Sequence, residues 1–157
     1  MPTLSDVEKL LAQFEIKVLR FAEHTPDSES AARAVGCSVA EIIKSILVNV
    51  GGHPVLVVTC GDAKINSSRL KRAMNLSGKV RFATADEVVR HTGYPPGSVT
   101  PFLLPSELPV LIDSSIHRFS TIYPAAGDDH SAVPVTIEQL LSLTGGTEVD
   151  VCDLRRS

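Results

Sequence analysis

Two neighbouring apolar segments place the strongest constraint on the fold of this 157-residue chain. Residues 45–50 read SILVNV and residues 54–59 read PVLVVT, and both are rich in the β-branched residues that favour strands. Gly51, Gly52 and His53 join the two segments, which is the spacing of a β-hairpin turn. We therefore expect two adjacent central strands, around which the other elements must be placed.

Helix and strand patterns alternate along the rest of the chain. Helical spacing or capping residues predict helices at residues 4–14, 28–35, 66–74, 84–93 and 136–143. A capping box of Ser38 and Glu41 predicts a further short helix, with Lys44 at its end. Further strand patterns include residues 16–21, 80–83, 101–104, 110–113, 120–123, 133–136 and 148–152. Short connections between several of these strands predict a single-domain α+β fold, with a mixed, mostly antiparallel sheet of about seven strands flanked by helices.

Composition excludes several classes of protein. A formal net charge of -3 argues against a protein that coats long nucleic acids, because such proteins neutralise many phosphates. Three separated cysteines without a CxxC pair encode neither a disulfide framework nor a thiolate zinc site. The first residues lack the basic start and apolar run of a signal peptide, and no apolar stretch approaches the ~20 residues that span a bilayer. We expect a soluble, cytoplasmic protein without a membrane partner.

The segment at residues 94–101 reads YPPGSVTP, and its prolines and glycine predict a shaped loop rather than regular structure. On local composition alone, a rigid connector between a helix and a strand is the more common role for such a loop.

Several landmarks occur together and in order: HTPDS from His24, EIIKSILV, VLVVTCGDAKIN, TGYPPGSVTPF, VLIDSSI and the pair Ala126–Gly127. Over nearly its full length the chain resembles the YbaK/ProX family of editing domains, aminoacyl-tRNA deacylases similar to the domain inserted in bacterial prolyl-tRNA synthetases. The resemblance implies one editing domain over residues 1–157, with a curved mixed sheet. It also implies hydrolysis, in trans, of the ester bond of mischarged aminoacyl-tRNA, with a tRNA(Pro)-type editing substrate.

The resemblance assigns catalytic roles to Lys44, as the family's functional lysine, and to residues 97–101, as its GxxxP loop. An aminoacyl ester is already activated, so the site needs mainly to position a nucleophile and stabilise an oxyanion. Gly97 and Ser98 could offer backbone N–H groups, and Pro101 restrains the loop. Lys44 could hold phosphate, ribose or the carbonyl region, although an arbitrary lysine at a helix end is usually solvated. No cofactor is implied.

Five further residues are candidates for substrate binding: Ser45, His24, Asp113, Gly127 and His130. Asp113 could instead cap the turn that follows it, Gly127 could serve a turn only, and either histidine could be an ordinary surface residue. Asp128, Asp129 and His130 form a loop cluster that departs from the family pattern, so this wall is expected to influence amino-acid choice. We assign no metal to it, because adjacent loop carboxylates are usually just solvated.

Positive charge concentrates in the middle of the chain, where Lys64, Arg69, Lys71 and Arg72 are candidates for RNA binding. A solvated helix face is an equally good explanation. The expected partner is the acceptor end of aminoacyl-tRNA. Prolyl-tRNA synthetase is a second potential partner; we expect a monomer and no DNA partner. The alternative function is a non-catalytic tRNA- or synthetase-binding module, and the sequence leaves open whether alanyl, cysteinyl, seryl or threonyl groups are removed.

Overall fold

The predicted hairpin is the centre of the fold. A computed structural model describes residues 2–154, in which β2 (Ile42–Val50) and β3 (His53–Cys60) pair antiparallel. Their register runs from Ile43 opposite Cys60 to Val50 opposite His53. Gly51 is required in the turn, because its φ is +56° and an added Cβ would lie 2.2 Å from the Ser77 carbonyl oxygen.

Four more strands extend the hairpin into an open, mixed sheet. The order along the sheet is β5 (Val80–Phe82), β2, β3, β6 (Val110–Asp113) and β9 (Thr147–Val149), and β7 (Tyr123–Pro124) also pairs with β2. The β2–β3 and β2–β5 pairs are antiparallel, whereas the β3–β6, β6–β9 and β2–β7 pairs are parallel. The predicted α+β class is therefore confirmed.

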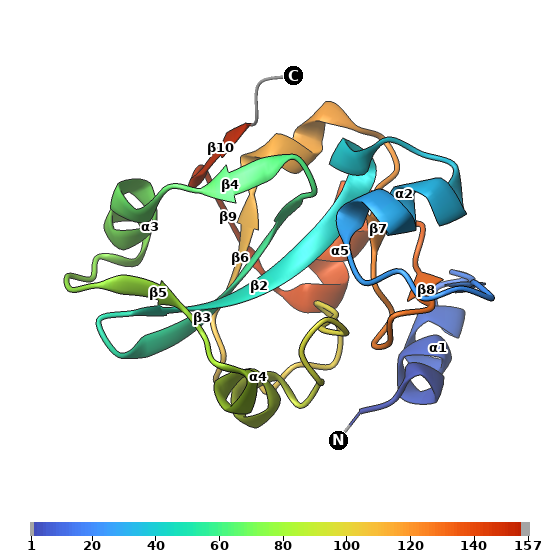
Figure 1. The fold of residues 1–157 in the computed structure, drawn as a ribbon, viewed down its shortest axis with the longest axis horizontal. Coiled ribbons are helices and arrows are strands. Elements are labelled where there is room, and N and C mark those ends of the chain that lie inside the picture. The colour runs from blue at the N-terminus through green and yellow to red at the C-terminus, as the bar shows by residue number, and fades with distance from the viewer. Residues whose placement is uncertain (1, 155–157) are drawn as a thin grey trace.

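Two small antiparallel pairs lie beside this sheet. One joins β1 (Leu19–Arg20) to β8 (Ser131–Ala132), and the other joins β4 (Ala63–Ile65) to β10 (Cys152–Leu154). In the view of Figure 1, the β4–β10 pair lies above β2 and β3, and the β1–β8 pair lies to their right.

Within residues 2–154 the chain forms five α-helices. They are α1 (Leu4–Ala12), α2 (Ser28–Val35), α3 (Ser67–Met74), α4 (Ala85–Thr92) and α5 (Ile137–Thr144). All five begin at a side-chain cap, and α2, α4 and α5 end at a glycine in the left-handed conformation. The ends at Gly36 and Gly93 follow the sequence prediction, whereas the end of α5 at Gly145 was not predicted. Helix α3 lies with the β4–β10 pair on one side of β2, and α4 lies on the other side (Figure 1).

The hairpin is buried on both faces, which explains its nearly continuous apolar sequence. Residues 55–58 of β3 are 0% exposed. Strands that are covered on both sides lose the alternation of polar and apolar residues. Apolar side chains of the core therefore pack against both faces of the sheet.

The sequence predictions differ from the structure where local patterns were ambiguous. Lys44 lies within β2 rather than at a helix end, because the box of Ser38 and Glu41 caps only one 3-10 turn, η1 (Val39–Glu41). Residues 101–104 form no strand; Leu103 has a φ of +55°, which is incompatible with a strand. The strand predicted at 148–152 is divided between two strands, β9 and β10. Of the strand predicted at 120–123, only Tyr123 belongs to a strand, the short β7.

Asp113 ties the end of β6 to the start of β10. Its carboxylate is 1% exposed and accepts hydrogen bonds from the backbone N–H groups of Val151 (2.9 Å) and Cys152 (3.1 Å) through Oδ1. Its Oδ2 accepts from Ser115 N–H (3.1 Å), at the start of the 3-10 turn η2 (Ser114–Arg118). This is the capping role that the sequence left open, and it occupies both carboxylate oxygens with backbone donors.

Replacing Asp113 by Asn should lower the free energy of unfolding by about 1–3 kcal/mol, because the amide NH2 would face a backbone N–H in either orientation. Urea titration followed by circular dichroism measures this change. Asp150→Asn is the matched control: Asp150 is exposed and pairs with Arg69, so its loss should cost less than about 1 kcal/mol. Equal effects of the two substitutions would contradict the structural role of Asp113.

Candidate functional site

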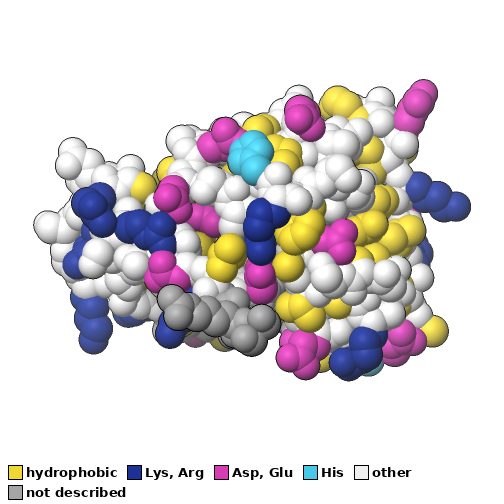
Figure 2. Space-filling model, turned by 90° about the horizontal axis from the view of Figure 1, so that it is seen from above, with side chains coloured by type: hydrophobic (Ala, Val, Ile, Leu, Met, Phe, Trp, Pro, Cys, Tyr) yellow, Lys and Arg dark blue, Asp and Glu magenta, His cyan; other side chains and the backbone are white. Residues whose placement is uncertain are grey.

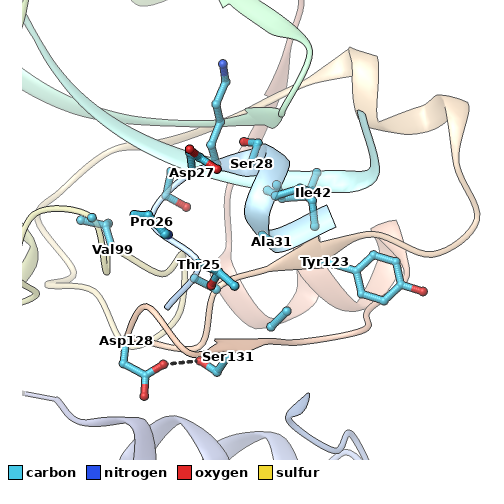
Figure 3. A pocket seen from close by; sticks show the side chains of 16 residues that line it. Thr25, Pro26, Asp27, Ser28, Ala31, Ile42, Val99, Tyr123, Asp128 and Ser131 are labelled. Atoms are coloured by element: carbon cyan, nitrogen blue, oxygen red, sulfur yellow. Dashed lines mark hydrogen bonds between the residues drawn. The ribbon is translucent and has the colours of Figure 1, made fainter. Parts of the chain in front are cut away.

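A cavity of about 320 Å³ opens beside the first half of β2. Its walls come from α2, from the loop at 97–99, and from the segment at 123–132. Figure 3 shows Thr25, Pro26 and Asp27 next to Ser28 of α2, with Asp128 and Ser131 below them. The lining residues are Thr25, Pro26, Asp27, Ser28, Ala31, Ile42, Ile43, Lys44, Ser45, Gly97, Val99, Tyr123, Ala125, Asp128, Ser131 and Ala132.

The cavity lies against a gap in the pairing of β2. On its outer edge, β7 pairs with residues 42–43 and β5 pairs with residues 48–50, so within the described chain residues 44–46 have no strand partner there. The Ile42 carbonyl accepts from Gly61 on the β3 side, whereas the Leu47 carbonyl accepts from Ala83 on the outer side. Because this direction alternates along an antiparallel ladder, the N–H and C=O of Ser45 point outward into the gap.

The side chain of Ser45 presents a second polar group to the cavity. Its Oγ is buried, and no hydrogen-bond partner for it is found among residues 2–154. Buried hydroxyls are normally hydrogen-bonded, and one that is not points to a ligand or an ordered water. The outward-pointing backbone groups of Ser45 thus lie at the base of the cavity, and its enclosed hydroxyl lies beside them.

Lys44 also lines the cavity, but its ammonium group is held on the side of β4. Successive residues of a strand point to opposite faces, so the side chain of Lys44 diverges from that of Ser45. The half-buried Lys44 donates from Nζ to the Ala63 carbonyl oxygen at 2.6 Å. The pKa of Asp62 is lowered, chiefly by hydrogen bonds from Arg118 and to a smaller extent by the positive charge of Lys44.

Gly97 forms the opposite lip of the cavity. Its φ is +83°, which explains why glycine occupies this position, and a Cβ added there would meet no atom within 4 Å. The next N–H, that of Ser98, donates to the Pro95 carbonyl at 3.0 Å and so closes the turn. Pro101 is buried and lines a different cavity. Of the predicted loop residues, Gly97 is the one that borders the site.

Tyr94 braces both loops of the site, and sequence reasoning missed this role. The side chain is fully buried, and its hydroxyl donates to the Phe102 carbonyl at 2.7 Å. Burial raises the pKa of Tyr94, so the hydroxyl remains a donor. Gly127 lies against the same ring, where a Cβ would be 3.1 Å from Tyr94 Cε1. Glycine at position 127 therefore allows its loop to pack closely against the ring of Tyr94. The available signal was a tyrosine directly after the helix-ending Gly93.

The 127–131 loop carries two carboxylates, of which that of Asp128 belongs to a residue lining the cavity. Asp128 Oδ1 accepts from the Ser131 hydroxyl (2.7 Å) and from the His130 backbone N–H (2.9 Å). Asp129 lies between His24 (2.9 Å) and His130 (2.6 Å), and the hydrogen bond from His24 lowers the pKa of Asp129.

The two histidines stand outside the lining of the cavity. The ligand atoms of His24, Asp129 and His130 lie within 4.8 Å of one another, so this cluster could hold a metal ion. The hydrogen bonds within the cluster explain the same arrangement without one.

The predicted RNA-binding cations lie away from the cavity and have different surroundings. Arg69 is ion-paired with Asp150 and Asp153, which attaches α3 to β10. Lys64 on β4 borders a shallow hollow that also contains Phe82, whose side chain is 70% exposed. Lys71 and Arg72 border another hollow on α3. Figure 2 shows cationic side chains gathered at the end of the molecule where α3 lies, with Asp and Glu side chains beside them.

The nearby cysteines are poor nucleophiles. Burial raises the pKa of Cys152 to about 11, although the charge of Lys44 acts in the opposite direction. Burial also raises the pKa of Cys60. The thiolate is the reactive form of cysteine, and it is scarce at neutral pH for both groups. The cavity is therefore equipped to bind and polarise a substrate rather than to attack it through sulfur.

No helix in the described part of the chain has the length and apolar character needed to cross a membrane.

Comparison with known proteins identifies the family of the chain. Residues 22–143 match the model of the aminoacyl-tRNA editing domain. The protein YwhH of Bacillus subtilis (strain 168) is 33% identical over 140 residues, covering 88% of each chain. The proline–tRNA ligase of Bacillus licheniformis is 36% identical over 107 residues, covering 66% of this chain but 18% of the ligase.

Two solved structures share the fold of this chain over nearly its full length. A crystal structure of a candidate trans-editing enzyme for prolyl-tRNA synthetase has a TM-score of 0.86, with 26% identity and 98% of each chain covered. A second crystal structure, that of the hypothetical protein APE2540, has a TM-score of 0.84 at 29% identity and covers 94% of this chain. The chain belongs to the aminoacyl-tRNA editing domain family.

Proposed function

We propose that this protein hydrolyses the ester bond of mischarged aminoacyl-tRNA in trans, with a tRNA(Pro)-type editing substrate. One observation carries the proposal: Lys44 and Ser45 of β2 line the same cavity of about 320 Å³ as Gly97, which lies in a loop about 50 residues further along the chain. The similarity to a candidate trans-editing enzyme and to part of proline–tRNA ligases supports the same reaction.

The proposed mechanism relies on positioning rather than on a protein nucleophile. Water attacks the ester carbonyl, which is already activated, and the terminal ribose oxygen is the leaving group. The backbone N–H of Gly97 is the proposed oxyanion donor, because its lip is open and Ser98 N–H is used within the turn. Lys44 supplies positive charge for the terminal phosphate and ribose, where a flexible ammonium suits phosphate.

The cavity suits a small acyl group. Small side chains, those of Ala31, Thr25 and Ala132, line it, and Ser45 offers backbone groups at its base. Alanyl, cysteinyl, seryl and threonyl groups are the proposed candidates. Discrimination among them rests on contacts worth about 1–3 kcal/mol per methylene.

The acceptor stem is proposed to lie along the cationic end of the molecule. Lys64, Lys71 and Arg72 remain candidates for phosphate contacts, and the exposed ring of Phe82 beside Lys64 is suited to stack on a base. Arg69 is the least suitable of the four candidates for RNA binding, because its guanidinium already donates hydrogen bonds to Asp150, Asp153 and the Cys152 carbonyl. We further propose a cytoplasmic monomer that works alone or with prolyl-tRNA synthetase, and that has no DNA partner.

Lys44→Ala should reduce deacylation by about 100-fold or more, because the site loses its positive charge while the fold is retained. The measurement is release of labelled amino acid from Ala-, Cys-, Ser- and Thr-charged tRNA. Lys17→Ala is the matched control, since this exposed lysine lies outside the cavity and outside the proposed RNA contacts, and it should leave turnover nearly unchanged. Normal turnover by folded Lys44→Ala would remove Lys44 from the mechanism. No release by the wild type from any tRNA would favour the non-catalytic binding module instead.

Gly97→Ala should lower kcat and cost about 1–2 kcal/mol of stability, because its φ of +83° is unfavourable for a residue with a Cβ and the new methyl enters open space at the lip. Gly36→Ala matches it as a control: Gly36 has a φ of +84°, its added Cβ also meets nothing, and it lies outside the lining of the cavity. We expect both variants to lose a similar amount of stability, and only Gly97→Ala to show a lower kcat. Equal kcat for the two variants would refute the oxyanion assignment.

A further inference from the structure

The cavity has an uneven distribution of charge. Its charged lining residues are Lys44, Asp27 and Asp128. The ammonium group of Lys44 is held on the β4 side by the Ala63 carbonyl, whereas the carboxylates come from the segment before α2 and from the 127–131 loop. The wall formed by the 127–131 loop therefore carries a carboxylate, that of Asp128, which suits a cationic group of the substrate.

An aminoacyl ester carries such a group. Its α-amino nitrogen belongs to a class that titrates at about pH 8, so the ammonium form is abundant near neutral pH. An α-hydroxy ester of the same size lacks this charge, and an N-acylated ester lacks it as well. A carboxylate in the cavity can therefore distinguish a free aminoacyl group from both.

Hydrogen bonds within its own loop fix the orientation of the Asp128 carboxylate. Two donors, the Ser131 hydroxyl and the His130 N–H, both bind its Oδ1, which sets the orientation of the carboxylate and leaves Oδ2 outside these two hydrogen bonds. Figure 3 shows the bond between Asp128 and Ser131. The side chain is partly shielded from solvent, which strengthens a charge-assisted hydrogen bond. Ser131, which is buried, also lines the cavity.

The neighbouring carboxylates are engaged in other ways. Asp27 is exposed and caps α2, accepting from the Ser30 backbone N–H at 2.8 Å. Asp129 is paired with His24 and His130 and does not line the cavity. Asp128 is thus the carboxylate that combines a fixed orientation, partial burial and a place in the lining.

We propose that Asp128 binds the α-ammonium group of the aminoacyl ester and so restricts the site to substrates with a free amine. This inference rests on the proposed function and names the chemical feature by which the same cavity recognises its substrate. Peptidyl-tRNA and other N-acylated esters are excluded as a consequence, because they carry an amide in place of the ammonium.

The test compares each aminoacyl-tRNA that the wild type hydrolyses with its α-hydroxy analogue, prepared by nitrous acid deamination. The analogue has nearly the same size and no charge, so steric exclusion does not confound the result. Each rate is divided by the spontaneous rate for the same ester, because the amine also alters intrinsic reactivity. The wild type should favour the free amine by about 10- to 100-fold in kcat/KM.

Asp128→Asn should remove most of that preference, chiefly by raising KM for the aminoacyl ester while leaving the α-hydroxy ester unaffected. Asn retains an Oδ1 acceptor for Ser131 and His130, so the loop should hold its shape, and thermal unfolding checks this. Asp129→Asn is the matched control and should preserve the preference. Asp27→Asn keeps its helix cap, since Asn is also a good N-cap residue, and it tests the other carboxylate of the lining.

The outcomes separate this inference from the proposed function. Hydrolysis by the wild type without preference for the free amine overturns the role of Asp128 and leaves the deacylase intact. Loss of the preference in Asp27→Asn but not in Asp128→Asn overturns it too, and moves the ammonium to the other carboxylate. Absence of hydrolysis of any aminoacyl-tRNA overturns the deacylase and, with it, this inference. The wild-type comparison remains decisive even if a variant fails to fold.

Discussion

The pairing of β2 with β3 is the interaction on which the rest of the structure depends. The hairpin supplies the strands to which β5, β6 and β7 attach, and it is covered on both faces. It also fixes the direction of each side chain along β2. Lys44 points toward β4 and Ser45 presents its groups at the cavity because they are consecutive residues in this register.

The support of Lys44 extends to the end of the described chain. Asp113 holds the backbone of Val151 and Cys152, β10 then pairs with β4, and β4 provides the carbonyl of Ala63 that accepts from Lys44. The residues that match the family model end at 143, before β10. The position of Lys44 therefore depends on contacts outside the matched region.

Much of the fold could be predicted from sequence because its signals are local. The hairpin turn, the helix caps and the glycine ends follow from neighbouring residues. The site could be predicted only in part: Lys44, Ser45 and Gly97 meet at the cavity, whereas Asp113 and Arg69 are engaged by segments near residue 150. The role of Tyr94 depends on two loops that meet only in the folded chain, and no spacing in the sequence encodes that contact. The hydrogen bonds of Asp128 to residues 130 and 131 are local, but its place in the lining of the cavity is not.

The gap in the outer edge of β2 has a second consequence. Unpaired strand edges are templates for association with other chains, and proteins commonly cover them or charge them. Here the open residues 44–46 lie against a cavity walled by α2 and two loops, which leaves room for a small molecule but not for a full strand. The walls of the cavity thus also shield this strand edge, so mutations that remove them would expose a template for association with other chains.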